Sequence, residues 1–312
     1  MDFFKNRIRT VQELGFGSKE YKQSVRFLNP DGSVNVRRTG LGRFGNIDIY
    51  HWLISTTRTK LVMVIVIWYI AINMLFAALY FSIGPEHFGG LDGGPGALQH
   101  FFGLFFFSAQ TITTLGYGHV YPIGNAASVA AAFESLLGLL SFAVATGVLY
   151  GRFSRPMAHV LYSKNILIAP YRDGQALMFR LANKKQSELI ESEVKVSVTF
   201  NNPETRKREF YNLNLEIEKI HFLTLSWTIV HPLNEESPLF GFSNSDFVNT
   251  DIEFLILLKS INDTLSQNVY SRYSYKANDL VEGAKFKPLQ QIADRKGRII
   301  ISVDHIHQFE KL

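Results

Sequence analysis

Two long apolar runs constrain this chain more than any other feature. Residues 61–81 contain no charged side chain, and residues 125–150 contain only Glu134. Each run is long enough to cross a hydrocarbon core of about 30 Å as a helix, which needs about 20 residues. We therefore set aside a soluble enzyme and expect a membrane protein with spanning helices at 58–82 and 125–152.

The distribution of lysine and arginine predicts the topology. Residues 1–60 hold 11 of them and the chain after residue 150 holds 21, whereas residues 82–124 hold none. The positive-inside rule then places both termini in the cytoplasm and the segment between the two runs outside. The tail after residue 150 balances its basic residues with 19 acidic ones, which is not typical of a nucleic-acid-binding arm. The absence of cysteine excludes disulfides, cysteine-ligated metals and a thiol nucleophile.

The outer segment contains an apolar stretch that is too short to span a membrane. A Gly/Pro-rich stretch at 84–96 precedes an aromatic run. The apolar stretch from Leu98 to Ala109 is only 12 residues long. Such a half-length segment predicts a re-entrant pore helix at 98–113, preceded by an extracellular turret at 83–97. The alternative is an amphipathic helix that lies on the outer surface.

The residues that follow this stretch carry the chemistry. A dehydrated K⁺ needs oxygen ligands in place of its water shell, and backbone carbonyls that point inward can supply them. Inward carbonyls in succession need alternating backbone handedness, which glycine permits at little steric cost. One chain supplies one wall of such a site, so the site requires a ring of subunits. The predicted selectivity filter is Thr114, Leu115, Gly116, Tyr117 and Gly118, with K⁺ bound at Thr114, Leu115, Gly116 and Tyr117.

The tail is predicted to be rich in strands. Short apolar or alternating runs at 193–200, 210–217 and 253–259 are separated by turn-forming clusters. Strands at this spacing predict an antiparallel β-sandwich, which we place at 153–312.

Together these residues resemble the inward-rectifier potassium channels, and most closely their prokaryotic members. The resemblance implies a homotetramer whose cytoplasmic tails form an immunoglobulin-like vestibule that continues the pore. It also implies an interfacial slide helix at 47–57, after a cytoplasmic N-terminal segment at 1–46. The matching segments besides TTLGYG are IDIYHWL (47–53), GRFSRP (151–156), SWTIVHPLNEESPLFG (226–241) and SQNVYSRYSY (266–275).

The resemblance assigns roles to residues behind and below the filter. Glu134, a charge inside an apolar span, is expected either to form a structural hydrogen bond behind the filter or to attract cations. The family's acid behind the filter and its basic partner correspond to Gln110 and Val120, so that ion pair is absent. The cavity acid of strong rectifiers corresponds to Phe142, so we expect weak rectification.

The inner half of the second span carries the predicted gate. Tyr150 is expected to close the pore as an aromatic plug, or to belong to the interfacial aromatic belt. Gly138 and Gly147 are either hinges or sites of close helix packing.

Four basic residues at the inner ends of the two spans form a predicted phospholipid-headgroup site, for a phosphoinositide or another anionic lipid. Plain topological anchoring is the alternative. The residues are Arg58, Lys60, Arg152 and Arg155.

We therefore expect a multi-pass channel of the plasma membrane, or of the bacterial inner membrane, that conducts K⁺ passively. The expected fold is membrane α with a C-terminal cytoplasmic β-sandwich, in a homotetramer. K⁺ in the filter is the only cofactor that we predict, and Ba²⁺, Mg²⁺ or polyamines are the expected blockers. We expect neither enzymatic activity nor a nucleic-acid partner. The alternative is a weakly selective two-transmembrane cation channel, because Leu115 lacks the β-branched stiffness of valine or isoleucine.

Overall fold

The computed structural model describes residues 26–29, 32–37, 48–91, 96–154, 158–185, 188–202, 207–289, 291–293 and 299–312. The chain divides into two compact units. After their predicted locations we name Gly40–Arg155 the membrane unit, and Met1–Thr39 together with Pro156–Leu312 the cytoplasmic unit.

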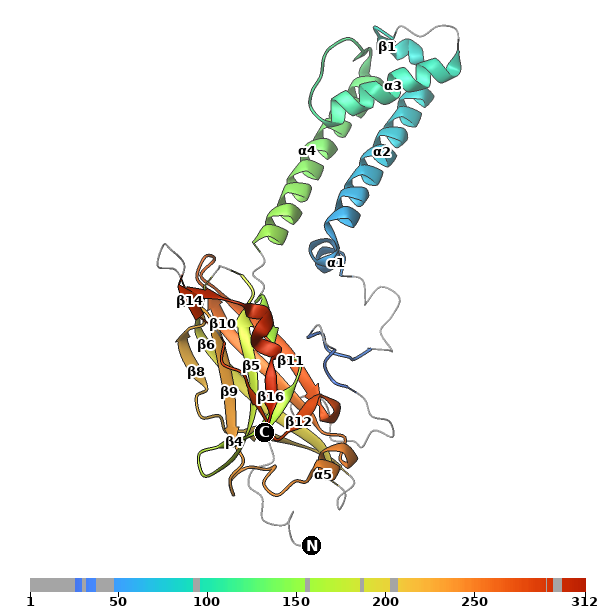
Figure 1. The fold of residues 1–312 in the computed structure, drawn as a ribbon. Helices are drawn as coiled ribbons and strands as arrows, with labels where there is room; N and C mark the ends of the chain where they lie inside the picture. Colours follow the sequence, from blue (N-terminus) through green and yellow to red (C-terminus); the bar gives the residue numbers. More distant parts are fainter. Residues whose placement is uncertain are drawn as a thin grey trace. The chain divides into compact units, whose positions relative to one another are not determined.

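The described residues of the membrane unit form four α-helices, two of them long, and the shorter α3 contacts both long helices (Figure 1). Both long helices are long and apolar enough to cross a membrane. Its elements are α1 (Ile49–Ser55), α2 (Arg58–Ile83), η1 (Pro85–His87), β1 (Phe88–Gly89), α3 (Ala97–Ile112), β2 (Tyr121–Pro122) and α4 (Asn125–Phe153).

Sequence chemistry explains where these helices begin and end. Gly84 ends α2 with φ +118°, and Pro85 follows it, so the helix cannot continue. Around α2 most large apolar side chains are exposed, as expected for a helix that faces lipid. The buried core gathers where α2, α3 and α4 meet, and its members are Phe76, Tyr80, Phe88, Leu104, Phe107 and Ala127.

The cytoplasmic unit is a sandwich of two five-stranded sheets. One sheet has the order β11-β10-β6-β7 with β8 paired to β6, and the other has the order β12-β4-β5-β3 with β9 paired to β5. The β12–β4 pair is parallel, whereas the sequence predicted antiparallel strands throughout. The strands of the two sheets are β3 (Val160–Tyr162), β4 (Ile166–Tyr171), β5 (Gly174–Asn183), β6 (Leu189–Asn202), β7 (Lys207–Leu213), β8 (Lys219–Phe222), β9 (Ser226–Pro232), β10 (Glu253–Asn262), β11 (Gln267–Lys276) and β12 (Leu280–Glu282).

Short elements complete the unit. Two further two-stranded sheets pair β13 with β16 and β14 with β15. The remaining elements are α5 (Asn244–Asn249), η2 (Ala277–Asp279), β13 (Ala284–Phe286), β14 (Gln291–Ala293), β15 (Ile299–Ile301), η3 (Val303–His307) and β16 (Phe309–Lys311).

Strand β10 shows how this sandwich uses its two faces. Phe254, Ile256 and Leu258 are fully buried in the core between the sheets. Leu255 points to the opposite face, as strand alternation requires. There it packs against Phe27 of the N-terminal segment in a second small cluster. The apolar run in this strand is therefore explained in part by cover on its second face, which reaches Leu255 but leaves Leu257 exposed.

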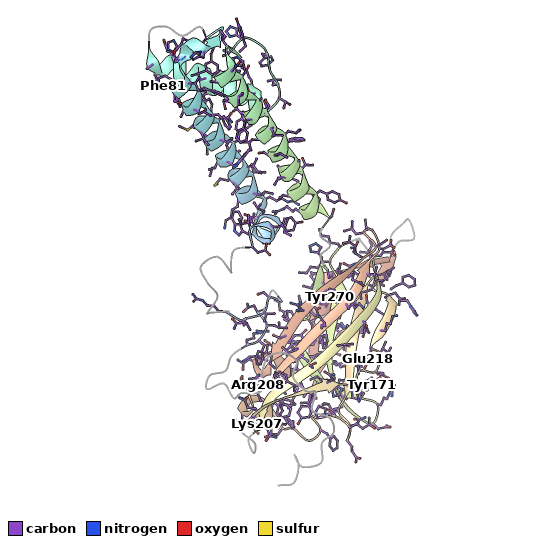
Figure 2. All side chains as sticks on the ribbon, turned by 180° about the vertical axis from the view of Figure 1, so that it is seen from behind. Phe81, Tyr171, Lys207, Arg208, Glu218 and Tyr270 are labelled. Atoms are coloured by element: carbon purple, nitrogen blue, oxygen red, sulfur yellow. The ribbon has the colours of Figure 1, made fainter. Side chains whose placement is uncertain are left out.

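A buried charge cluster joins three strands and loops of the sandwich. Arg208 on β7, labelled in Figure 2, has no exposed side-chain surface. Its Nη1 donates to Asp251 Oδ2 at 2.9 Å, and its Nε donates to Thr199 Oγ1 at 3.0 Å. Lys276 Nζ lies 3.1 Å from the other carboxylate oxygen of Asp251.

We predict that Arg208→Ala destabilises the sandwich by about 3–5 kcal/mol, because removal of one partner leaves a poorly compensated buried charge and a cavity. Arg172→Ala is the matched control, since that arginine also pairs with a carboxylate, of Glu216, but is 70% exposed. We expect no measurable change from the control. Hydrogen exchange of sandwich peptides measures both, and equal effects from the two variants would contradict this assignment.

Candidate ion-conduction site

The segment after α3 has the backbone geometry that a carbonyl-lined site requires. Thr114, Gly116 and Gly118 have positive φ angles of 58°, 54° and 77°, whereas the intervening Leu115 and Tyr117 do not. Handedness therefore alternates from residue to residue across the predicted filter. A positive φ is unusual for a β-branched residue, so Thr114 holds its conformation at a cost in backbone strain.

The end of α3 holds the start of this segment. The backbone amide of Thr114 donates to the Thr111 carbonyl at 3.0 Å. The Gln110 carbonyl accepts from the amides of Leu115 at 2.9 Å and Gly116 at 3.3 Å. The segment's amides thus turn back onto the helix end. Within the described part of the chain, no hydrogen-bond donor reaches the carbonyls of residues 114–117.

Residues of the predicted turret contact the chain just after the other end of this segment. Strands β1 and β2 pair Phe88 with Pro122 and Gly89 with Tyr121. The Ile123 amide also donates to the His87 carbonyl at 2.7 Å. Gly90, with φ +72°, lies so close to His119 that a Cβ would stand 1.7 Å from the His119 carbonyl oxygen. Only glycine allows this approach, which joins the turret to the residue after the filter.

A buried polar network links α2, α3 and α4. Glu134 on α4 has no exposed surface. Its Oε2 accepts from the Tyr80 hydroxyl of α2 at 2.5 Å, and its Oε1 contacts the Ser108 hydroxyl of α3. The Ser108 hydroxyl also lies 2.9 Å from Asn73 Oδ1, and Asn73 donates to the Tyr69 carbonyl at 2.7 Å. A carboxylate enclosed in this way favours the structural role over direct attraction of cations.

Sequence analysis did not identify the partners of Glu134. Asn73 and Ser108 are polar residues inside apolar runs, and this was the available signal. Gln110 is half-buried and lines a cavity of about 420 Å³ with Tyr117, His119 and Val120, among others. Gln110 and Val120 are both neutral, so no ion pair forms between them.

The predicted cavity and gate residues lie along α4. Phe142 and Tyr150 are each 73% exposed in the subunit. Gly138 differs from Gly147: a Cβ at Gly138 would lie 2.0 Å from the Ile112 carbonyl oxygen, whereas no atom of the described residues lies within 4 Å of a Cβ at Gly147. The contact at Gly138 favours close packing against the end of α3.

The predicted lipid site is described for three of its four residues, because Arg155 lies outside the described residues. Arg58 and Lys60 are exposed in the first turn of α2. Arg152, in the last turn of α4, is half-buried, and its buried Nη1 has no hydrogen-bond partner among the described residues. Helix α1 packs on the same end of α4, where Tyr50 Oη lies 2.8 Å from the Cβ position of Gly151.

Comparisons with known proteins cover both units. Residues 61–155 match the family model described as ion channel, and residues 160–312 match that of the inward rectifier potassium channel C-terminal domain. The inward rectifier potassium channel Kirbac3.1 of Paramagnetospirillum magnetotacticum is 34% identical over 274 residues, which cover 86% of this chain and 91% of the relative. The ATP-sensitive inward rectifier potassium channel 12 of mouse is 25% identical over 313 residues, covering 91% of this chain and 71% of that protein.

The human channel of the same name is likewise 25% identical, over 91% of this chain and 70% of that protein. Among solved structures, a DNA-bound alkylpurine DNA glycosylase of Pseudomonas fluorescens aligns over 60% of this chain and 49% of that chain. Its identity is 9% and its TM-score is 0.19.

The contact at Gly138 generates a prediction. Gly138→Ala should destabilise the membrane unit by about 1–3 kcal/mol and reduce ion flux, because the new methyl group meets backbone that cannot move aside. Gly147→Ala places the same methyl group on the same helix in open space. Flux into liposomes and the thermal stability of the purified protein are the measurements. A more damaging effect at Gly147 would show that the hinge, and not the packing contact, matters.

Proposed function

Because the chain belongs to the inward-rectifier potassium channel family, as its 34% identity over 91% of a bacterial member shows, we propose that it forms a homotetrameric pore whose filter selects K⁺ at residues 114–117. The observation that carries the proposal is the alternating φ of Thr114, Gly116 and Gly118. This alternation turns successive carbonyls the same way, and carbonyls at membrane depth are tolerated only where they line a water-filled or ion-filled path.

Four copies of the chain complete the proposed site. A single subunit leaves Leu115 and Tyr117 largely exposed, and it surrounds no ion by itself. In potassium channels four such loops line the filter, and ions pass by knocking on between adjacent sites. The exposed faces of α4, with Phe142 and Tyr150, are then proposed to face the cavity and the inner gate.

The network around Glu134 is proposed to support the filter from behind. It joins the pore helix to both spanning helices through one carboxylate, in a chain whose Gln110 and Val120 cannot form an ion pair. In a low-dielectric region these hydrogen bonds are strong, and loss of any partner is costly. We therefore assign Glu134, Tyr80 and Ser108 to filter positioning.

Gating is proposed to combine the cytoplasmic unit with anionic lipid. Arg152, half-buried at the end of α4, has an Nη1 group with no hydrogen-bond partner in the described part of the chain, and this group is suited to donate to a phosphate oxygen. Arg58 and Lys60 add positive charge at the same, cytoplasmic end of the spans, where each is worth about 1 kcal/mol near an anionic surface. Both termini are proposed to be cytoplasmic.

The experiment that tests this function is ⁸⁶Rb⁺ uptake into liposomes that contain the purified protein, with K⁺ trapped inside. We expect uptake that Ba²⁺ blocks and that external Na⁺ does not reduce. The assay is run with and without a phosphoinositide, and the ratio of the two fluxes defines the lipid response. Equal competition by Na⁺ would instead support the weakly selective cation channel, with Leu115 as its cause.

Weak rectification generates a second prediction. Phe142→Asp should increase block by internal Mg²⁺ or spermine by about tenfold or more, because a ring of carboxylates would attract polycations in a low-dielectric cavity. Phe142→Asn is the neutral control of the same shape and should leave block unchanged. Current–voltage curves in planar bilayers measure this. Equal block in both variants would exclude Phe142 from the cavity wall.

A further inference from the structure

The N-terminal segment of the chain docks onto the sandwich through a buried carboxylate. We define the anchor segment as residues 26–29 and 32–37, which fold into a small hairpin closed by the Leu28–Val34 bridge. Glu253, the first residue of β10, has no exposed surface. Its two oxygens accept from the Phe27 amide at 2.9 and 3.1 Å, and one of them accepts from the Leu28 amide at 3.3 Å.

Side chains on both partners reinforce this docking. Buried Ser274 on β11 donates its hydroxyl to the Leu28 carbonyl at 3.2 Å and accepts from Arg26 Nε at 3.0 Å. Arg26 also donates to the Ser274 carbonyl. Phe27 packs against Phe210, and the Arg208 guanidinium lies 4.7 Å from the centre of the Phe27 ring.

The docking is expected to be permanent because it supplies the backbone N–H donors that stabilise the buried Glu253 carboxylate. A buried carboxylate is costly unless it is paired or hydrogen-bonded. No salt bridge reaches Glu253 from the described residues, so the amides of Phe27 and Leu28 supply its compensation. Release of the anchor segment would leave that carboxylate in the protein without these donors.

A docked anchor segment changes how the two units are connected. One covalent link runs from the end of α4 at Phe153 to β3 at Val160. The other runs from the anchor segment to α1 at Ile49, and α1 itself contacts α4. With the segment fixed to the sandwich, movement of the cytoplasmic unit acts on both helices. Without the docking, it acts through α4 alone.

We infer that Glu253 is a positioning residue for gating, which holds the anchor segment on β10 and so gives the cytoplasmic unit a second mechanical connection, to α1. This inference rests on the proposed function, because it concerns how the channel responds to lipid. It does not involve the filter, which lies in the other unit.

The first test is hydrogen exchange in the full-length channel. Glu253→Gln keeps the size of the side chain but replaces one acceptor with an N–H donor. We expect the amides of Phe27 and Leu28 to exchange about tenfold or more faster, with the core strands unchanged. Glu218→Gln, at an exposed residue labelled in Figure 2, makes the same chemical change and should have no effect. In the wild-type channel these amides should stay protected both with and without the phosphoinositide.

The second test is the lipid response of the same variants in the ⁸⁶Rb⁺ assay. We expect the ratio of fluxes with and without the phosphoinositide to fall toward one in Glu253→Gln and to remain at the wild-type value in Glu218→Gln. Na⁺ competition and Ba²⁺ block should be unchanged in both. If Glu253 served only the stability of the sandwich, its substitution would not lower the flux ratio selectively. A lower ratio together with normal selectivity and tetramer assembly therefore indicates a role in gating.

Three results would overturn the inference. They are an unchanged exchange rate in Glu253→Gln, a faster exchange rate with a normal lipid response, or loss of protection in wild type in one lipid condition. If Glu253→Gln fails to assemble, Ser274→Ala is tested by the same criteria, because it removes a hydroxyl from the docking without stranding a charge. Failure of the proposed function can be distinguished from failure of this inference. The first appears as non-selective or absent flux through the wild-type channel, and the hydrogen-exchange rates of wild type and Glu253→Gln still test the docking in that case.

Discussion

Backbone carbonyls without hydrogen-bond donors are the constraint on which the membrane unit depends. Among the described residues, the amides of Thr114, Leu115 and Gly116 donate to carbonyls at the end of α3, and no donor reaches the carbonyls of residues 114–117. At the membrane depth that we propose for this segment, water would not replace the missing donors. Such a segment is stable only if something else binds the oxygens and if the surrounding structure fixes a strained backbone. The helix end at Gln110 fixes it from one side, and the β1–β2 brace with its Gly90–His119 contact fixes it from the other.

The same logic explains why a carboxylate is retained inside an apolar span. Glu134 would be expensive among lipid tails, but here it is enclosed by hydroxyls from the two neighbouring helices. A buried polar group of this kind rigidifies its surroundings only when all of its partners are present. Gly138 follows one helical turn later on α4 and allows α4 to reach the last carbonyls of α3. Hydrogen bonds to Glu134 and close packing at Gly138 thus fix α3 at two adjacent turns of α4.

Features of the structure that depend on neighbouring residues could be predicted from the sequence, whereas contacts between residues far apart in the chain could not. The two long apolar helices and the short helix between them depend on length and composition, so the sequence predicts them almost directly. The filter at residues 114–118 stays a prediction from glycine placement. The partners of Glu134 could not be predicted, because Tyr80 and Ser108 are distant in sequence and are chosen by packing. The docking of Phe27 against Glu253 joins residues 226 positions apart, and its only local trace was the continuous apolar run of β10. The parallel β12–β4 pair likewise depends on chain topology and not on alternation.

The most direct test of the central claim is the thermal stability of the assembled protein in K⁺ and in Na⁺ at equal ionic strength. If carbonyls of four chains form a site that selects K⁺, bound K⁺ must stabilise the tetramer, by about 2.7 kcal/mol at a concentration one hundred times the dissociation constant. The account predicts that dissociation to monomers requires a higher temperature in K⁺ than in Na⁺. Identical dissociation temperatures in the two salts would contradict it.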